Sequence, residues 1–150
     1  AEVGLEIACV DIGGWDTHNA QGQLEGELPD LLNEFSTGLA ALYHDLGERA
    51  KRLTVVTMSE FGRRVQENGS GGTDHGHGTA YWVMGGKVRG GIKGEQVALS
   101  ARSLNENRDY PVLNDYRDLL GGLFQRLYGL DAKQVQAVFP QSKPKDLGLV

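Results

Sequence analysis

The sequence predicts an α/β fold built on a mixed, mostly parallel sheet. An apolar run at Leu5–Ile12 and a β-branched run at Leu53–Met58 enclose a long segment with helical spacing, which is the order of a strand–helix–strand unit. A third apolar run, Thr79–Met84, follows a long glycine-rich loop. The two strands of such a unit run parallel and are joined by a right-handed crossover, so we expect the first two runs to share a sheet.

The first strand and the helix have clear boundaries. Leu5–Ile12 ends at two glycines and has the continuous apolar character of a buried strand. The helix begins near Leu28 and carries acidic residues at its start and basic residues beyond its end, as the helix dipole favours. Its apolar stripe consists of Leu28, Leu31, Leu32, Phe35, Leu39, Leu42 and Leu46.

The remaining elements follow from caps and short apolar runs. Val97–Leu99 is expected to form a short extra strand, and Asn114 or Asp115 to cap a helix that ends at Gly129. Asp131 and Gln134 form a capping box for a short last helix, and the tail from residue 141 is expected to be loosely held. Because no repeat or linker divides the chain, residues 1–150 are expected to form a single domain.

Composition excludes several classes of partner. The 150 residues carry a formal net charge of −5, which argues against nucleic acid and anionic membranes as binding surfaces. No apolar run is long enough to span a membrane. Cys9 is the only cysteine, so no intrachain disulfide can form. The chain starts without Met, and we expect it to be a mature or excised segment that has lost any targeting peptide.

Three of the four histidines lie in two glycine-framed clusters far apart in sequence. The first, DIGGWDTH, holds Asp11, Asp16 and His18, and the second, GGTDHGHG, holds Asp74 and a pair of histidines at positions 75 and 77. Imidazole and carboxylate groups this close can converge on a divalent cation. Each cluster alone is also typical of turns, which Asp and His often cap. The pair of clusters favours a shared metal site.

The expected sheet gives this hypothesis a geometric consequence. Ligands of open α/β sheets bind beyond the carboxyl ends of the parallel strands. Asp16 and His18 follow the first strand and Glu60 follows the second, whereas the 75/77 cluster precedes Thr79–Met84. The clusters therefore meet only if Thr79–Met84 runs antiparallel to the other strands. The spacing leaves open which of the two histidines, 75 or 77, points inward.

Several of these residues have an alternative role. Asp11 fits a metal ligand and a hydrogen-bond acceptor at the end of its strand equally well. Glu60 likewise fits a metal ligand and an ion pair with Arg63 or Arg64. Beside a metal, Arg63 would suit a phosphate or sulfate oxyanion. His44 falls on the polar flank of the long helix, where an exposed side chain without a role is expected.

The motifs GGWDTH, VVTMSEFGR, DHGHGTAYWVMGG and VFP together resemble a bacterial family known as domain of unknown function 1501. In that family this region is similar to the C-terminal half of the alkaline phosphatase and sulfatase superfamily. The resemblance implies the C-terminal portion of a three-layer α/β/α sandwich with a mixed, mostly parallel sheet. It also implies metal-dependent hydrolysis of phosphate or sulfate esters, with a small-molecule or polymer ester as substrate.

The resemblance also assigns roles to residues. Asp16 and His18 resemble the superfamily's Asp and His pair, Glu60 falls where its Asp-His is expected, and His75 or His77 resembles its last metal histidine. The implied ligand set is therefore Asp16, His18, Glu60, His75 and His77. The ion is expected to be Zn²⁺, with Mn²⁺, Mg²⁺ or Ca²⁺ as alternatives.

Two consequences of the resemblance concern what lies outside the chain. The superfamily's nucleophile is expected upstream of Ala1, because Ser59 and Thr73 do not follow its pattern. The resemblance also implies a periplasmic or exported protein. The rival interpretation is a non-catalytic exported binding or assembly module that keeps the fold without the chemistry. A mononuclear iron site with two histidines and one carboxylate is a third interpretation.

Overall fold

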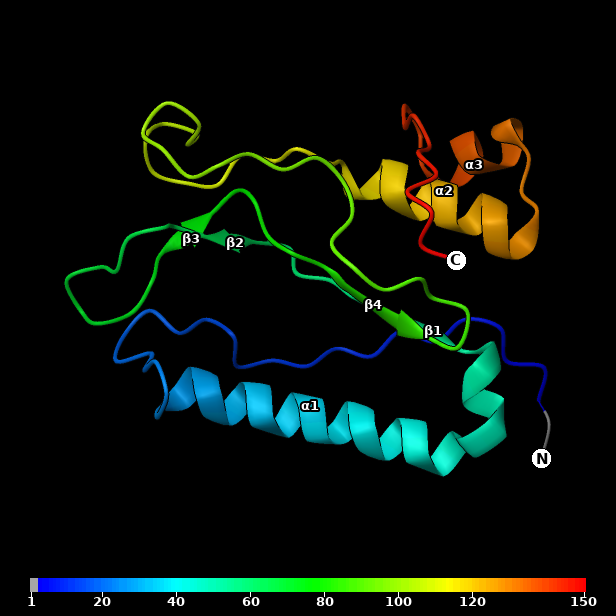
Figure 1. The fold of residues 1–150 in the computed structure, drawn as a ribbon, viewed down its shortest axis with the longest axis horizontal. Coiled ribbons are helices and arrows are strands. Elements are labelled where there is room, and N and C mark those ends of the chain that lie inside the picture. The colour runs from blue at the N-terminus through cyan, green and yellow to red at the C-terminus, as the bar shows by residue number, and fades with distance from the viewer. Residues whose placement is uncertain (1–2) are drawn as a thin grey trace.

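The computed structural model describes residues 3–150 (Figure 1). Its helices are α1 (Glu27–Leu46), the 3₁₀ helix η1 (Gly47–Arg52), α2 (Tyr116–Tyr128) and α3 (Ala132–Val138). Its strands are β1 (Thr54–Thr57), β2 (Gly62–Arg63), β3 (His75–Gly76) and β4 (Trp82–Gly85). No helix in this part of the chain is long and apolar enough to cross a membrane.

The strands form two small antiparallel pairs. β1 pairs with β4, so that Thr54 lies opposite Gly85, and β2 pairs with β3, so that Arg63 lies opposite His75. The antiparallel direction of β4 relative to β1 confirms what the metal hypothesis required of the third apolar run. The three-layer sandwich with a mostly parallel sheet stays a prediction, since residues 3–150 contain these two-stranded sheets alone.

The prediction of a first strand at Leu5–Ile12 was wrong. Leu5–Ile12 is coil, and Leu5 and Ile12 are 73% and 51% exposed. Figure 1 draws this segment without an arrow. The apolar run favours a strand locally, but a strand requires a neighbour that exchanges backbone hydrogen bonds with it. Within residues 3–150 no segment pairs with it, so the parallel strand–helix–strand unit does not form.

The long helix was predicted correctly, and one of its aromatic side chains contacts the loop that carries Asp16. α1 begins one residue before the predicted start, and Gly47, with φ of 51°, follows its last residue. The Phe35 ring lies 5.8 Å from the Trp15 ring and 6.1 Å from the Trp82 ring. Phe35 thus joins α1 to β4 and to the loop that carries Asp16.

The C-terminal helices begin and end at the predicted caps. The Asp115 carboxylate accepts a hydrogen bond from the Arg117 backbone amide at 2.8 Å, and Gly129 closes α2 with φ of 67°. Asp131 and Gln134 form the expected capping box of α3. The short strand expected at Val97–Leu99 is absent and this segment is coil.

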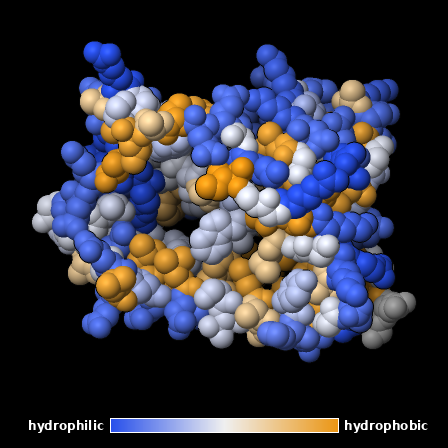
Figure 2. All heavy atoms as spheres, viewed as in Figure 1, coloured by the Kyte–Doolittle hydropathy of each residue, from blue (hydrophilic) through white to orange (hydrophobic). Residues whose placement is uncertain are grey.

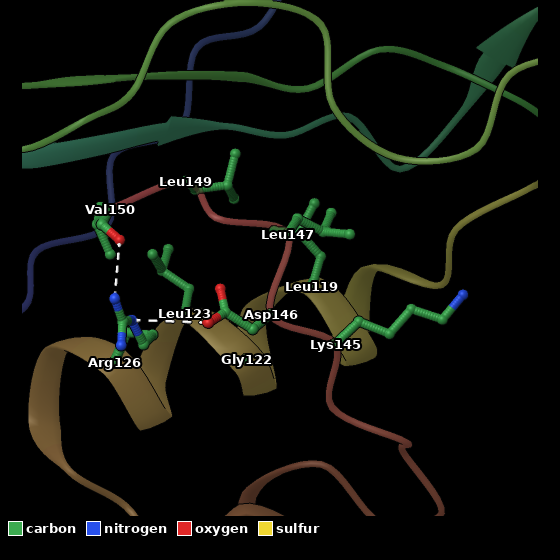
Figure 3. A pocket seen from close by; sticks show the side chains of 9 residues that line it. All are labelled: Leu119, Gly122, Leu123, Arg126, Lys145, Asp146, Leu147, Leu149 and Val150. Atoms are coloured by element: carbon green, nitrogen blue, oxygen red, sulfur yellow. Dashed lines mark hydrogen bonds and ion pairs between the residues drawn. The ribbon is translucent and has the colours of Figure 1, made fainter.

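The C-terminal segment is bound more firmly than the sequence indicated. It lies along α2, where the Lys145 amide donates to the Asp118 carbonyl at 3.0 Å and Arg126 faces Asp146 at 3.7 Å. The small pocket in Figure 3 lies between α2 and this segment. Leu123 of α2 and Val135 of α3 are among the few buried apolar side chains of the described residues. Figure 2 shows apolar groups spread over the surface instead.

Glycine at position 122 permits the contact between α2 and the C-terminal segment. A Cβ atom at Gly122 would lie 1.9 Å from the Lys145 carbonyl oxygen. We expect Gly122→Ala to lower the free energy of unfolding by about 1–3 kcal/mol because the segment must move away. Urea unfolding measures this loss.

The control for this substitution is Gly38→Ala on α1. A Cβ at Gly38 meets no atom within 4 Å, and alanine is the better helix former by up to about 1 kcal/mol. The control should therefore be as stable as the parent protein or more so. Equal stability of the two variants would contradict the packing of the C-terminal segment on α2.

Candidate functional site

The two glycine-framed clusters lie against each other in the structure. The backbone amide of Ala20 donates to the Ser70 carbonyl at 2.8 Å, and that of Gln21 donates to the Gly71 carbonyl at 2.9 Å. Farther along, the amide of Thr73 donates to the Thr17 carbonyl at 3.4 Å. These bonds join residues 15–21, the first loop, to residues 68–75, the second loop.

Asn68 connects the two loops through both ends of its amide. Its Nδ2 donates to the His18 carbonyl at 2.9 Å and to Asp74 Oδ1 at 3.0 Å. Its Oδ1 accepts from the backbone amides of Ser70 and Gly72 at 2.9 and 3.1 Å. All the polar atoms of the side chain are therefore engaged in holding the loops.

Arg63 connects the loops from the side of β2. Its two terminal nitrogens donate to the backbone carbonyls of Thr73 and Trp15, and Nη2 also lies 3.3 Å from Thr17 Oγ1. The guanidinium stacks over the Phe61 ring at 5.0 Å. The structure gives Arg63 a role as a clamp, and its contact with an oxyanion stays a prediction.

The close approach of the loops depends on glycine. A Cβ at Gly72 would lie 2.3 Å from both the carbonyl carbon and the carbonyl oxygen of His18. No side chain fits at that position unless the loops separate. The glycine-rich composition of the second loop is therefore a condition for bringing His18 near His75.

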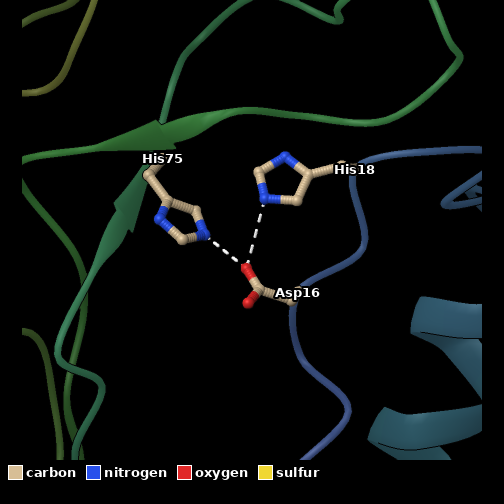
Figure 4. A group of neighbouring side chains, drawn as sticks. All are labelled: Asp16, His18 and His75. Atoms are coloured by element: carbon tan, nitrogen blue, oxygen red, sulfur yellow. Dashed lines mark hydrogen bonds and ion pairs between the residues drawn. The ribbon is translucent and has the colours of Figure 1, made fainter.

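Asp16, His18 and His75 converge at the contact between the loops (Figure 4). His18 Nε2 lies 3.2 Å from Asp16 Oδ1, and His75 Nε2 hydrogen-bonds to the same oxygen. The candidate ligand atoms of the three residues all lie within 4.8 Å of one another. The prediction that the two clusters meet is confirmed, and of the two candidate histidines it is His75 that joins the group.

The group is open to solvent and polarised. The Asp16 side chain is 66% exposed, against 39% for His18 and 45% for His75. The hydrogen bond from His75 is the main cause that lowers the pKa of Asp16, and a weaker electrostatic interaction with His18 adds to it. The lowered pKa favours the ionised form of the Asp16 carboxylate, which faces both imidazole rings.

The ring of His75 is oriented by an aromatic neighbour. The Phe61 ring stacks on it with centroids 4.0 Å apart and an angle of 10° between the planes. His75 also lies opposite Arg63 in the β2–β3 pair. The stacking and the strand register together direct Nε2 of His75 at Asp16.

His77 lies apart from this group and has its own partners. Its Nδ1 is 2.7 Å from Oδ2 of Asp109, which is fully buried. Arg108 donates to both oxygens of the same carboxylate at 2.8 and 2.9 Å. These hydrogen bonds, chiefly those from Arg108, hold the pKa of Asp109 well below its usual range.

The sequence did not reveal the Arg108–Asp109 pair. It lies in the stretch NENRDYP, which is polar and has no helix or strand pattern. An adjacent Arg and Asp carry no spacing signal, because such pairs are common on solvated surfaces. Only the burial of Asp109 distinguishes this pair from those.

The other predicted residues lie outside the group. Glu60 is exposed and is not part of the cluster of candidate ligand atoms. Ser59 Oγ donates to the Phe61 carbonyl at 2.7 Å, and Thr73 Oγ1 donates to Gln21 Oε1 at 2.8 Å. Both hydroxyls thus form hydrogen bonds within the protein.

Two imidazole nitrogens and one carboxylate oxygen form a donor set that suits a divalent cation. Zn²⁺ accepts His nitrogen and Asp oxygen as ligands, and a set of two histidines and one carboxylate also occurs with Fe²⁺. Both histidines approach Asp16 with the same ring nitrogen, Nε2. The residues present therefore fit a metal ion chemically.

The chain belongs to the family described as Protein of unknown function (DUF1501). The model of this family matches residues 1–139. No curated protein matches the chain, and no solved structure matches it. The family membership confirms the resemblance at the level of the family.

Gly72→Ala tests whether the close loop contact holds the group together. The added Cβ overlaps the His18 carbonyl, so we expect a loss of about 1–3 kcal/mol in unfolding free energy. We also expect the loss of the nuclear Overhauser effect between the rings of His18 and His75, whose centroids lie 4.8 Å apart.

Gly69→Ala is the matched control in the same loop. A Cβ at Gly69 meets nothing within 4 Å, so its rings should keep the contact. If Gly72→Ala kept the ring contact as well, the loop approach would not be what assembles the group.

The Asp109 carboxylate should make stability depend on acid. Because its pKa is lowered in the folded protein, its contribution is fully present above the unfolded carboxyl value of about 3.9 and is lost as pH falls through the folded value. We expect Asp109→Asn to flatten the fall in unfolding free energy below pH 5. Urea unfolding at pH 2–7 measures this dependence.

The control is Glu34→Gln on the exposed surface of α1, which changes the net charge equally. It should keep the acid dependence of the parent protein. Parallel curves for Asp109→Asn and the parent would show that the buried pair contributes nothing below pH 5.

Proposed function

We propose that the chain is part of a metal-dependent hydrolase of phosphate or sulfate esters. The observation that carries the proposal is the convergence of Asp16, His18 and His75 from two distant loops. These three residues would hold a divalent cation. Zn²⁺ suits the two imidazoles best, and Mn²⁺, Mg²⁺ or Ca²⁺ would require more oxygen ligands.

When bound, the cation would polarise an ester oxygen and lower the pKa of a coordinated water or hydroxyl. The residues of the chain contribute placement and charge. Asp16 supplies the negative charge of the donor set, and the exposure of the group leaves room for a bulky small-molecule or polymer ester. The oxyanion contact of Arg63 is a separate part of the proposal, and it would require the clamp to release a nitrogen.

The proposal rests on three ligands. Glu60 and His77, which the sequence also predicted as ligands, stay predictions because they lie outside the group. The His77–Asp109 pair has the form that metal-binding histidines often take, with a carboxylate behind one ring nitrogen. An exported or periplasmic location is likewise part of the proposal and follows from the resemblance.

The alternative is a non-catalytic exported binding or assembly module. The direct contacts of both Nε2 atoms with Asp16 favour it, because these atoms are then paired with a partner within the protein. In that case Asp16, His18 and His75 would serve only to hold the loops together. A metal-binding measurement separates the two functions.

We expect the purified protein to bind one Zn²⁺ per chain, measured by elemental analysis and by competition with a chromophoric chelator. His18→Ala and His75→Ala should each weaken binding by more than the roughly 10–100-fold of an outer-shell change, because a ligand is lost. His44→Ala, on the exposed side of α1, is the control and should bind as the parent does. A metal-free parent with unchanged stability in both histidine variants would favour the binding module.

Aryl phosphate and aryl sulfate esters then test the reaction. Turnover that requires added metal and disappears in His18→Ala would support the hydrolase. Recovery of iron instead of zinc in the elemental analysis would favour the mononuclear iron site.

A further inference from the structure

His18 lies between two carboxylates that face different nitrogens of its ring. Nε2 is 3.2 Å from Asp16 Oδ1, and Nδ1 is 3.5 Å from Asp74 Oδ1. Asp16 precedes His18 in the first loop, whereas Asp74 belongs to the second loop. The second loop therefore contacts the side of the ring that faces away from the converging group.

The Asp74 carboxylate is held in place by two other side chains. Asn68 Nδ2 donates to its Oδ1 at 3.0 Å, and Arg64 Nη1 lies 3.5 Å from its Oδ2. The same Asn68 nitrogen also donates to the His18 carbonyl. The backbone of His18 and the carboxylate behind its ring are thus fixed to one amide.

We propose that Asp74 is a positioning residue for the metal site, which accepts the Nδ1 proton of His18 and leaves Nε2 free to bind the cation. This inference rests on the proposed function. A neutral imidazole has one donor and one acceptor nitrogen, so a partner at Nδ1 decides which nitrogen is available. Carboxylates in this outer position fix both the tautomer and the ring orientation of metal-binding histidines.

The two histidines of the group are oriented by different means. His75 is held by the Phe61 ring stacked on it, and His18 by the carboxylate behind it. One short segment of the second loop therefore supplies His75 as a ligand and, with the preceding Asp74, orients the ligand from the first loop.

Zn²⁺ affinity of the whole chain tests the role of Asp74. We expect Asp74→Ala to weaken binding about 10–100-fold, and Asp74→Asn to retain most of the affinity because an amide oxygen still accepts the Nδ1 proton. Asp146→Ala is the control, since Asp146 also faces an arginine but lies beside α2. In the Zn²⁺-loaded parent at pH 8, ¹⁵N shifts of the His18 ring should show a protonated Nδ1 and a metal-bound Nε2.

Each outcome decides the inference. Asp74→Ala with the affinity of Asp146→Ala would overturn it and leave the proposed function intact. Equal losses in Asp74→Ala and Asp74→Asn would also overturn it, because charge and not the hydrogen bond would then matter. If Asp74→Ala does not fold, the ring shifts of the parent still decide, and a metal-bound Nδ1 would refute the role. A parent that binds no Zn²⁺ would overturn both this inference and the proposed function.

Discussion

The close contact between the loops at residues 15–21 and 68–75 is the constraint on which the site depends. No regular sheet holds these loops together. Their contact consists of backbone hydrogen bonds, the Asn68 amide and the Arg63 guanidinium. Glycine at position 72 allows the backbones to approach. His18 and Asp16 would be far from His75 without this contact, because the sequence between them includes all of α1 and β1.

The parts of the fold that were predicted correctly are those decided by local sequence. The caps at Asp115, Gly129 and Asp131 depend on residues only a few positions away. The strand expected at Leu5–Ile12 depends on a partner, which local sequence does not reveal, and the described residues provide none. The direction of β4 was predicted from the site instead, since only an antiparallel strand brings its preceding loop to His18.

The same distinction applies to the site. Residue type and glycine framing identified Asp16 and His18 and left His75 and His77 as alternatives, because few side chains suit a metal ion. The orientation of these side chains could not be predicted from the sequence, since it depends on tertiary hydrogen bonds. Asn68 belongs to no recognisable motif. Arg63 carries the same charge whether it clamps two loops or binds an oxyanion, and only its contacts distinguish the two roles.

The side chain that is buried among the candidate ligands is polar. Of the apolar side chains buried in residues 3–150, Val135 and Leu123 lie in the C-terminal helices and Ala50 lies in η1, whereas the buried polar Thr17 lies between the candidate ligands Asp16 and His18. A buried polar group must keep its hydrogen bonds, because losing one leaves a desolvated partner. The loops are therefore held by directional contacts that specify one arrangement. Such an arrangement presents its donor atoms already assembled, so less ordering is needed when a ligand binds.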